Sequence, residues 1–124
     1  MVMKILVIED SETRKEFFRE VLVGNMLSFS TSSDAAISLL KAEKFDLIFL
    51  DMDLDDGLGQ GLMVARWLKE TGNAYADVIV HSMNISVASE VKIILPETQI
   101  VPFAELKRIA ARFGNEEFIE RVLG

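Results

Sequence analysis

Short apolar segments alternate along the chain with longer segments in which apolar residues recur at helical spacing. A short apolar run bounded by polar or turn residues predicts a buried strand. Such runs span residues 4–8, 26–30, 47–50, 78–80 and 99–101. Strands that are apolar on both faces are typical of a parallel sheet that helices cover on each side.

The segments between these strands predict helices. Ser11 is the candidate N-cap of the first helix, and Ser33 or Asp34 is the candidate cap of the second. Pro102 is expected in the first turn of the last helix, which Gly114 interrupts before a final turn or two. The predicted helices span residues 12–23, 35–42, 62–70, 86–95 and 102–113, with the final turns at 116–123.

A strand followed by a helix thus occurs five times in 124 residues, without a linker or a repeat. This alternation predicts a single α/β domain over residues 1–124. Right-handed crossover connections leave few arrangements, of which we expect a doubly wound five-stranded parallel sheet in the order 2-1-3-4-5. The core is expected to hold Trp67 and the phenylalanines, with Phe103, Leu106, Ala110 and Phe113 as the inward stripe of the last helix.

The composition narrows the class of protein. Half of the residues are hydrophobic, no apolar run approaches the roughly 20 residues of a membrane span, and the first residues show no signal-peptide pattern. The chain has no cysteine, which excludes disulfides and thiolate chemistry. Its net charge of -7 disfavours an extended nucleic-acid surface. We therefore expect a cytoplasmic protein, monomeric or weakly dimeric.

An acidic stretch directly follows the third predicted strand. In FLDMDLDDGLGQG, residues 49–61, four aspartates lie within six residues. The first predicted strand ends in Glu9 and Asp10, the third in Asp51, and the fourth in His81 and Ser82. In the expected strand order these ends meet at one edge of the sheet, so the three carboxylates converge.

Three carboxylates at close range require a cation. Hard oxygen ligands favour Mg²⁺, which also accepts phosphate oxygens. A carboxylate beside bound Mg²⁺ can attack a phosphoryl donor and form an acyl phosphate. At the end of the neighbouring strand, Ser82 is suitably placed to hydrogen-bond a phosphoryl oxygen. The sequence therefore predicts a magnesium site with phosphoryl chemistry.

The segments that carry these acids resemble the receiver domain of two-component response regulators. KILVIED resembles its acid-pair strand, FDLIFLD its phosphoacceptor strand and VIVHS its hydroxyl-bearing strand. The resemblance implies the flavodoxin-like receiver fold and a kinase or effector as protein partner. It also implies a role for each candidate site residue. Asp51 is the phosphoacceptor, Asp10 and Glu9 are the acids on the metal side, the carbonyl of Asp53 binds the metal, and Ser82 contacts the phosphoryl group.

The chain departs from the usual receiver pattern at several positions. Receivers end the fifth strand with a lysine before proline, whereas this chain has Val101 there, and Thr98 stands where an aromatic residue is customary. The loop after Asp51 is longer than usual, and Asp55 replaces a customary proline. The lysine that grips the phosphoryl group is therefore missing.

A narrower resemblance is to a divergent receiver branch described as cyclic-phosphate-processing, which has been proposed to act on RNA ends. LDMDL, the helix at 61–68, VIVHSMN and IVPF carry this resemblance. His81, Ser82 and Asn84 match its HSxNP motif, and Arg14 fits an arginine in the first helix. Met52 stands where the branch has a histidine, so His81 alone would have to serve as acid and base.

These observations support three functions. The main expectation is an atypical stand-alone receiver that binds Mg²⁺, with Asp51 as candidate phosphoacceptor and no enzymatic turnover. The enzyme alternative is a metal-dependent phosphoesterase acting on a cyclic phosphate at an RNA end, with His81 as acid or base. The third is a pseudo-receiver that docks a partner through its last helix and adjoining loop.

Several polar residues also have purely structural interpretations. His81 can be a satisfied strand-end histidine, and Arg14 a charge on a solvated helix face. Asn84 is expected to cap the following helix. Asp53, Asp55 and Asp56 are expected in a solvated turn, from which Asp53 can add a contact to the metal ligands.

Overall fold

The computed structural model describes residues 2–124. Of Ile85 it describes the backbone alone. Five strands alternate with five helices, and both ends of each element lie close to the sequence prediction. The elements are β1 (Lys4–Ile8), α1 (Glu12–Val21), β2 (Met26–Ser30), α2 (Ser33–Ala42), β3 (Leu47–Leu50), α3 (Gly61–Leu68), β4 (Asp77–Val80), α4 (Ile85–Ile94), β5 (Gln99–Ile100) and α5 (Phe103–Leu123).

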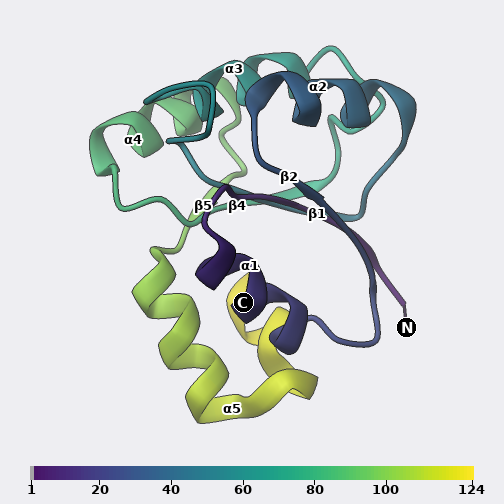
Figure 1. The fold of residues 1–124 in the computed structure, drawn as a ribbon, viewed down its shortest axis with the longest axis vertical. Helices are drawn as coiled ribbons and strands as arrows, with labels where there is room; N and C mark the ends of the chain where they lie inside the picture. Colours follow the sequence, from purple (N-terminus) through teal and green to yellow (C-terminus); the bar gives the residue numbers. More distant parts are fainter. Residues whose placement is uncertain (1) are drawn as a thin grey trace.

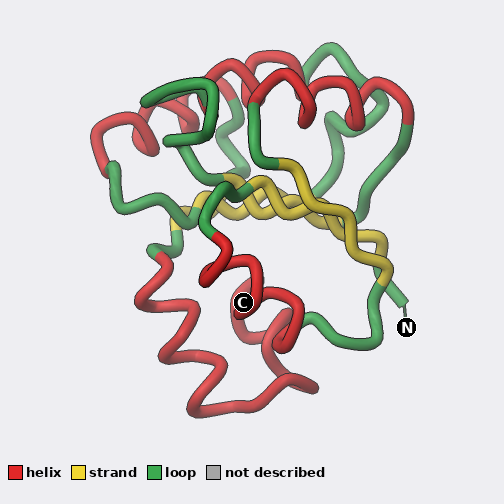
Figure 2. Tube along the Cα trace, viewed as in Figure 1, coloured by secondary structure: helices red, strands yellow, loops and turns green. Residues whose placement is uncertain are grey.

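The strands form one parallel sheet in the order β2-β1-β3-β4-β5, so the predicted fold and strand order are confirmed. Figure 1 shows the sheet nearly edge-on, with α2, α3 and α4 on one face and α1 and α5 on the other. The same layers are seen in Figure 2 as a strand layer between two helical ones. No helix among residues 2–124 is long and apolar enough to cross a membrane.

Alternate residues of each strand supply two hydrophobic cores. Side chains such as Ile8 and Leu50 pack against α2, α3 and α4, whereas Val7 and Phe49 pack against α1 and α5. This division follows from the two-residue period of a strand. Each fully buried aliphatic or aromatic side chain contributes roughly 1.5–3 kcal/mol to folding. The two cores therefore fix the sheet from both sides and hold its carboxyl edge in place.

Two core predictions are wrong. Trp67 is 38% exposed, and the Lys41 ammonium lies 4.2 Å from its ring centroid, so it forms a cation–π contact at the surface. Phe113 lies beneath Arg121, at 4.2 Å, and Ile109 packs against the core instead. Phe113 leaves the inward stripe because α5 bends at the next residue, Gly114, whose φ of 78° interrupts the helix and redirects its second half. The predicted break at this glycine is confirmed.

The start of α2 also differs from the prediction. The helix begins at Ser33, and Ser32 is its N-cap, because the Ser32 side chain accepts a hydrogen bond from the backbone N–H of Ala35. The carboxylate of Asp56 accepts hydrogen bonds from the Ser33 hydroxyl and from the backbone N–H groups of Ser33 and Asp34. An acid from a distant loop thus satisfies free N–H groups at a helix N-terminus.

The loop after β3 is therefore fastened rather than freely solvated. Asp56 is exposed yet binds α2. Burial is the largest single effect on its pKa and would raise it, but the hydrogen bonds from Ser33 and Asp34 together outweigh burial and lower the pKa. The backbone N–H of Asp55 donates to the Thr31 carbonyl, at 3.0 Å. The Asp53 carboxylate accepts a hydrogen bond from the Gly59 N–H, at 2.8 Å. These contacts shape the loop that leads from Asp51 to α3.

Gly61 allows α3 to begin directly against the end of β3. Its N–H donates to the Met52 carbonyl, at 2.9 Å. A Cβ atom at this position would overlap the Asp51 carbonyl oxygen and lie 2.7 Å from the Met52 Cα. Only glycine permits this approach of a helix to a strand end.

We predict that Gly61→Ala lowers the free energy of unfolding by about 1–3 kcal/mol, because the added methyl group must displace backbone atoms. Gly72→Ala is the matched control. Its Cβ would meet the movable end of the Lys44 side chain, so a change within about 0.5 kcal/mol is expected. Urea unfolding followed by circular dichroism measures both. Equal midpoints for the two variants would contradict this packing.

Candidate metal centre

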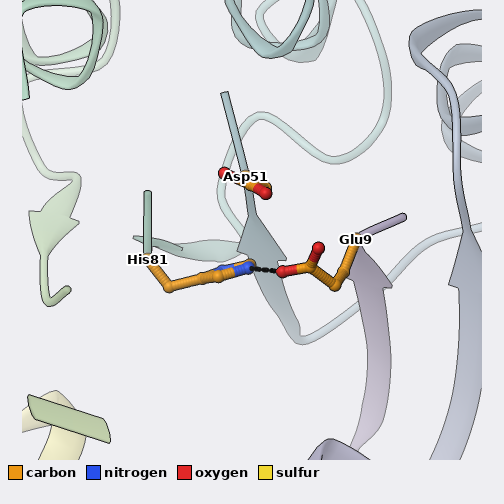
Figure 3. A group of neighbouring side chains, drawn as sticks. All are labelled: Glu9, Asp51 and His81. Atoms are coloured by element: carbon orange, nitrogen blue, oxygen red, sulfur yellow. Dashed lines mark hydrogen bonds and ion pairs between the residues drawn. The ribbon is translucent and has the colours of Figure 1, made fainter. Parts of the chain in front are cut away.

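Three buried polar side chains lie in one row at the carboxyl edge of the sheet. Ile8 pairs with Leu50, and Leu50 pairs with Val80, so the next residue on each strand falls in the same row. These next residues are Glu9, Asp51 and His81, which we call the acid–imidazole cluster. Each offers one ligand atom, and these atoms lie within 4.8 Å of one another (Figure 3). The predicted convergence of strand ends is thus present.

Glu9 is fully buried and paired on both oxygens. Its Oε2 accepts a hydrogen bond from the Ser11 N–H, at 3.0 Å, and its Oε1 lies 2.9 Å from Nε2 of His81. Burial alone would raise the pKa of Glu9. The hydrogen bond and charge of His81, with the Ser11 N–H and Arg14, outweigh that effect and lower the pKa. Glu9 is therefore held as a carboxylate in the interior.

Asp51 lies at the centre of the cluster and is 4% exposed. Its Oδ1 accepts a hydrogen bond from the Met52 N–H, at 2.8 Å, and its Oδ2 lies 3.5 Å from the Arg14 guanidinium. Burial and the negative charge of Glu9 raise the pKa of Asp51, against the opposing effects of His81, Met52 and Arg14. The carboxylate is thus short of positive charge.

The other two predicted metal ligands lie beside the cluster, not in it. Asp10 is partly exposed and is not among the three residues grouped within 4.8 Å. Its pKa is raised by burial, by a hydrogen bond and the charge of Glu9, and by the charge of Asp51. The Asp53 carboxylate is hydrogen-bonded to Gly59, which leaves its backbone carbonyl as the donor that the receiver resemblance implies.

His81 faces Glu9 from within the α1–α5 core. Its ring packs against Phe18, Phe49 and Phe103, with centroids 5.2, 6.5 and 6.4 Å away, and it has no exposed surface. Among the described residues, its Nδ1 is buried without a hydrogen-bond partner. Nε2, which lies 2.9 Å from Oε1 of Glu9, is therefore the ring nitrogen that is placed to donate a hydrogen bond to the carboxylate. In this position His81 orients Glu9.

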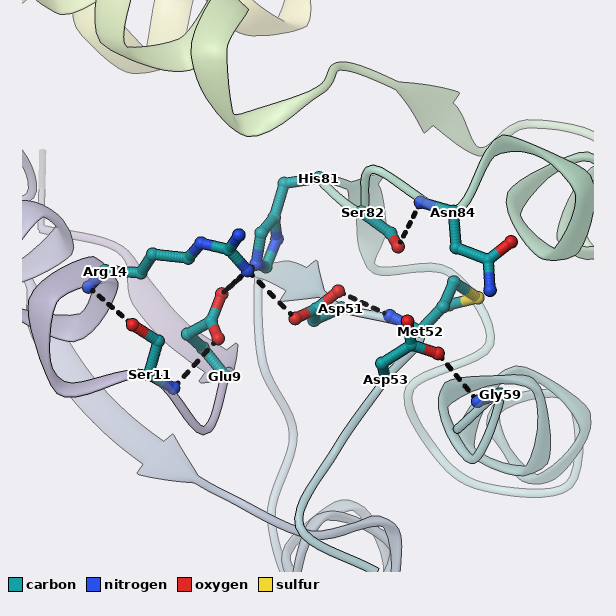
Figure 4. A network of polar contacts seen from close by, with 10 residues as sticks. All are labelled: Glu9, Ser11, Arg14, Asp51, Met52, Asp53, Gly59, His81, Ser82 and Asn84. Carbon is teal, nitrogen blue, oxygen red and sulfur yellow. Dashed lines mark hydrogen bonds and ion pairs between the residues drawn. The ribbon is translucent and has the colours of Figure 1, made fainter. Parts of the chain in front are cut away.

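Ser82 and Asn84 lie on the other side of Asp51 from Arg14 (Figure 4). Ser82 is almost fully buried, and its Oγ accepts a hydrogen bond from the Asn84 N–H, at 3.0 Å. The Asn84 side chain accepts from the Val87 N–H, at 3.4 Å, so its predicted capping of α4 is confirmed. The hydroxyl proton of Ser82 remains available for a ligand on the Asp51 side.

Arg14 points into the site. Its guanidinium lies 3.5 Å from Asp51 and 3.7 Å from Glu9, and it rests over the Phe103 ring at 5.3 Å. The interpretation of Arg14 as a charge on a solvated face is thus wrong. Ser11 caps α1 and also binds Glu9, which turns the first helical turn toward the cluster. The sequence signal was an arginine three residues after this cap.

Two positions lack the residues that the resemblances would supply. Val101, in place of lysine, packs against the α1–α5 core. Met52, in place of histidine, is fully buried in the α2–α4 core. Within residues 2–124, Arg14 is the only lysine or arginine that forms an ion pair with Asp51. The positive charge at this site therefore comes from α1 and not from the end of β5.

The donor set fits a hard divalent cation. Two buried carboxylates converge and a third lies beside them. Burial first, and the charge of Glu9 after it, raise the pKa of both Asp51 and Asp10. A divalent cation relieves the repulsion among these carboxylates, and oxygen donors are the ligands that Mg²⁺, Mn²⁺ and Ca²⁺ share. His81 Nε2 is engaged by Glu9, so the carboxylates are the ligands of choice.

A comparison with protein families finds one match. Residues 4–96 match the family described as the cyclic-phosphate processing receiver domain. The matched segment begins with β1 and ends just after α4, and it includes all three residues of the acid–imidazole cluster. Arg14, Ser82 and Asn84 also lie within it.

Solved structures of receivers share this fold. A CheY-like receiver domain from Methylobacillus flagellatus has a TM-score of 0.69 and 19% identity, over 90% of this chain and 98% of the other. The Mn²⁺-bound response regulator Rcp1 has a TM-score of 0.70 and 19% identity, over 88% and 92% of the two chains. A Burkholderia pseudomallei response regulator with a phosphorylated aspartate and a calcium ion has a TM-score of 0.69 and 23% identity, over 94% and 71%.

We predict that His81→Phe destabilises the protein by about 3 kcal/mol at neutral pH, because Glu9 is left buried without its main partner. The loss should shrink as the pH falls, since a lone buried carboxylate becomes protonated more readily and then carries no charge. Urea unfolding between pH 4 and pH 8 measures this dependence.

The control for that prediction is the double variant Glu9→Met with His81→Phe. It replaces both partners with apolar groups and should recover most of the lost stability. If the single and double variants were equally unstable at every pH, the loss of stability in His81→Phe would not come from leaving Glu9 without its partner.

Proposed function

Since the chain belongs to the cyclic-phosphate processing receiver domain family, we propose that it is an atypical receiver that binds Mg²⁺ and accepts a phosphoryl group on Asp51. The observation that carries this proposal is the convergence of Glu9, Asp51 and His81 within 4.8 Å, beside the Arg14 guanidinium. The convergence brings a nucleophilic carboxylate, a cation-binding pocket and a fixed positive charge together.

The proposed metal ligands are Glu9, Asp10, Asp51 and the backbone carbonyl of Asp53. Bound Mg²⁺ would supply positive charge against the crowded carboxylates and polarise an oxygen of the incoming phosphoryl group. The raised pKa values of Asp51 and Asp10 support this assignment, because burial and the nearby charge of Glu9 disfavour their ionised forms, which a bound cation would stabilise.

In the proposed reaction, Asp51 acts as the nucleophile. An oxygen of its carboxylate forms a bond to phosphorus, and the bond from phosphorus to the donor's leaving group breaks, with its electron pair going to that group. The Met52 N–H holds Oδ1 of Asp51, at 2.8 Å, which leaves Oδ2 directed toward Arg14. Burial of Asp51 limits the access of water to the acyl phosphate.

Two side chains are positioned to contact the transferred phosphoryl group. Arg14 takes the role of the missing lysine, because a guanidinium binds phosphoryl oxygens with paired, charge-assisted hydrogen bonds. Ser82 donates its hydroxyl proton to a phosphoryl oxygen from the opposite side of Asp51. His81 has no exposed surface, so its proposed part is to orient Glu9.

Receivers interact with kinases or effector proteins, and we propose such a partner as the phosphoryl donor or the reader of the phosphorylated state. The matched family, described as cyclic-phosphate processing, favours a second function, the cleavage of a cyclic phosphate. We propose an RNA end as the substrate of that alternative. Arg14 also supports that function, since it can bind the phosphodiester. The buried positions of His81 and Met52 disfavour side-chain acid–base catalysis. A cytoplasmic location suits both functions.

We predict that the protein gains one phosphoryl group when incubated with Mg²⁺ and acetyl phosphate, as measured by intact mass. Asp51→Asn should abolish the adduct, and the exposed Asp55→Asn should leave it unchanged. Arg14→Gln should slow its formation about tenfold or more, since hydrogen bonds to charged groups contribute roughly 1.5–3 kcal/mol. Arg19→Gln, on the outer face of α1, is its control.

Removal of divalent cations with a chelator should also prevent the adduct. If Mg²⁺ neither permits the adduct nor shifts the unfolding midpoint of the wild-type protein, the proposed function is wrong. An adduct that persists in Asp51→Asn would locate the phosphoacceptor elsewhere.

The second function predicts turnover of a 2',3'-cyclic nucleotide, followed by liquid chromatography. Arg14→Gln should abolish turnover, whereas Arg19→Gln should not. Turnover without an adduct on Asp51 would make the protein a phosphoesterase. A folded protein that shows neither activity would be a pseudo-receiver that acts by binding a partner.

A further inference from the structure

A pocket lies at the opposite edge of the sheet from the acid–imidazole cluster. Its volume is about 380 Å³, and it is bounded by the end of α3, the start of β4 and the segment between α4 and β5. Its walls are mostly apolar, with Leu68, Val78, Leu95 and Pro96 among them. Volume and lining are those of a site that takes an aromatic or aliphatic group.

One buried polar atom in this pocket lacks a partner. Thr98 is one of the residues that line the pocket and is 3% exposed, and its buried hydroxyl makes no hydrogen bond with the described residues. An unsatisfied buried hydroxyl costs about 1–3 kcal/mol, so it is expected to find a partner in the functional state. The group that enters the pocket should therefore be apolar with one polar end.

Tyr75 has this chemistry and lies on the rim of the same pocket. Its side chain is 100% exposed, in the loop between α3 and β4. The loop is anchored by the buried Asn73, which accepts from the Phe45 N–H at 2.6 Å and donates to the Leu40 and Glu43 carbonyls, each at 2.8 Å. Tyr75 is thus presented from an ordered base, and its ring has no aromatic or cation–π contact among the described residues.

We propose that this face forms a symmetric homodimer, in which Tyr75 of each copy enters the pocket of the other. A two-fold axis beside the pocket brings each protruding ring to the opposite cavity, since ring and cavity adjoin on one surface. The phenol hydroxyl then bonds to Thr98 of the second copy. Because the two-fold axis repeats this contact, the dimer buries both Tyr75 rings and gives both Thr98 hydroxyls a hydrogen-bond partner.

The charges on the rim suit a self-complementary contact. Lys69, Asp77 and Glu97 are exposed, and none forms an ion pair within the described part of the chain. Both signs lie around one pocket, so a two-fold axis can place Lys69 of each copy near an acid of the other. Such rim pairs contribute little to affinity but favour this orientation.

The dimer should be weak. A buried tyrosine ring removes roughly 150–250 Å² from water, so two rings cover only part of the roughly 1,200 Å² of a standard interface. A dissociation constant on the order of 10–100 µM is expected, which corresponds to about 5.5–7 kcal/mol. The face lies away from Asp51, so association does not obstruct the proposed phosphoryl site.

The test is sedimentation equilibrium of the full chain from about 5 to about 500 µM, which brackets the expected constant. We expect a concentration-dependent dimer. Tyr75→Ala should weaken it at least tenfold, and Tyr75 is fully exposed, so the variant should fold. Tyr75→Phe should have an intermediate effect, because it keeps the ring and loses the hydrogen bond.

Two further variants distinguish this specific contact from nonspecific association of exposed apolar side chains. Thr98→Val should weaken the dimer severalfold while raising the unfolding temperature of the monomer, because it removes the unsatisfied hydroxyl. Leu58→Ala removes another large exposed apolar side chain, 85% exposed, at the other edge of the sheet and should leave the dimer unchanged. A monomer at all concentrations, a dimer unaffected by Tyr75→Ala, or a small molecule retained by the monomer in native mass spectrometry would overturn the proposal.

Discussion

The parallel register of β1, β3 and β4 is the constraint on which the rest of the site depends. The hydrogen bonds from Asp51 N–H to the Ile8 carbonyl and from His81 N–H to the Leu50 carbonyl continue the ladder past the strand ends. Three polar side chains are thereby held side by side and closed off from most of the solvent. Their charges must be compensated within the protein. Burial, together with the charge of Glu9, nonetheless raises the pKa of Asp51 and Asp10, so the Ser11 and Met52 N–H groups, His81 and Arg14 offset the cost of the crowded carboxylates only in part.

Arg14 changes how positive charge reaches this site. In the usual receiver pattern a lysine before the proline supplies it from the end of the fifth strand, where this chain has Val101. Here the charge comes from the first turn of α1, whose cap Ser11 also binds Glu9. Any phosphoryl group on Asp51 would therefore bind to α1 and not to β5. The contacts of such a group would therefore lie on the α1 side of the site.

The sequence predicted what depends on local periodicity and on the order of elements. The strand order follows from alternating apolar runs, and the convergence of Glu9, Asp51 and His81 follows from the position of each residue just after its strand. The directions of side chains depend on packing that no local pattern specifies. Arg14, Trp67 and Phe113 all lie at helical positions compatible with either face, and the neighbours that decide come from other elements. The N-cap of α2 was misplaced for the same reason, because Asp56 stabilises the earlier start from a loop more than twenty residues away.

The fastening of the loop after β3 has a consequence for which ion the pocket accepts. Asp56 ties this loop to α2, Asp53 ties it to Gly59, and the tight approach of Gly61 leaves the strand end no room to shift. If these residues bind an ion, ligands held by so many contacts would adjust little to a larger one. Selection among hard cations then rests on ionic radius and coordination number, because a flexible pocket adapts to Ca²⁺ whereas a stiff one with few protein ligands suits a compact, partly hydrated ion.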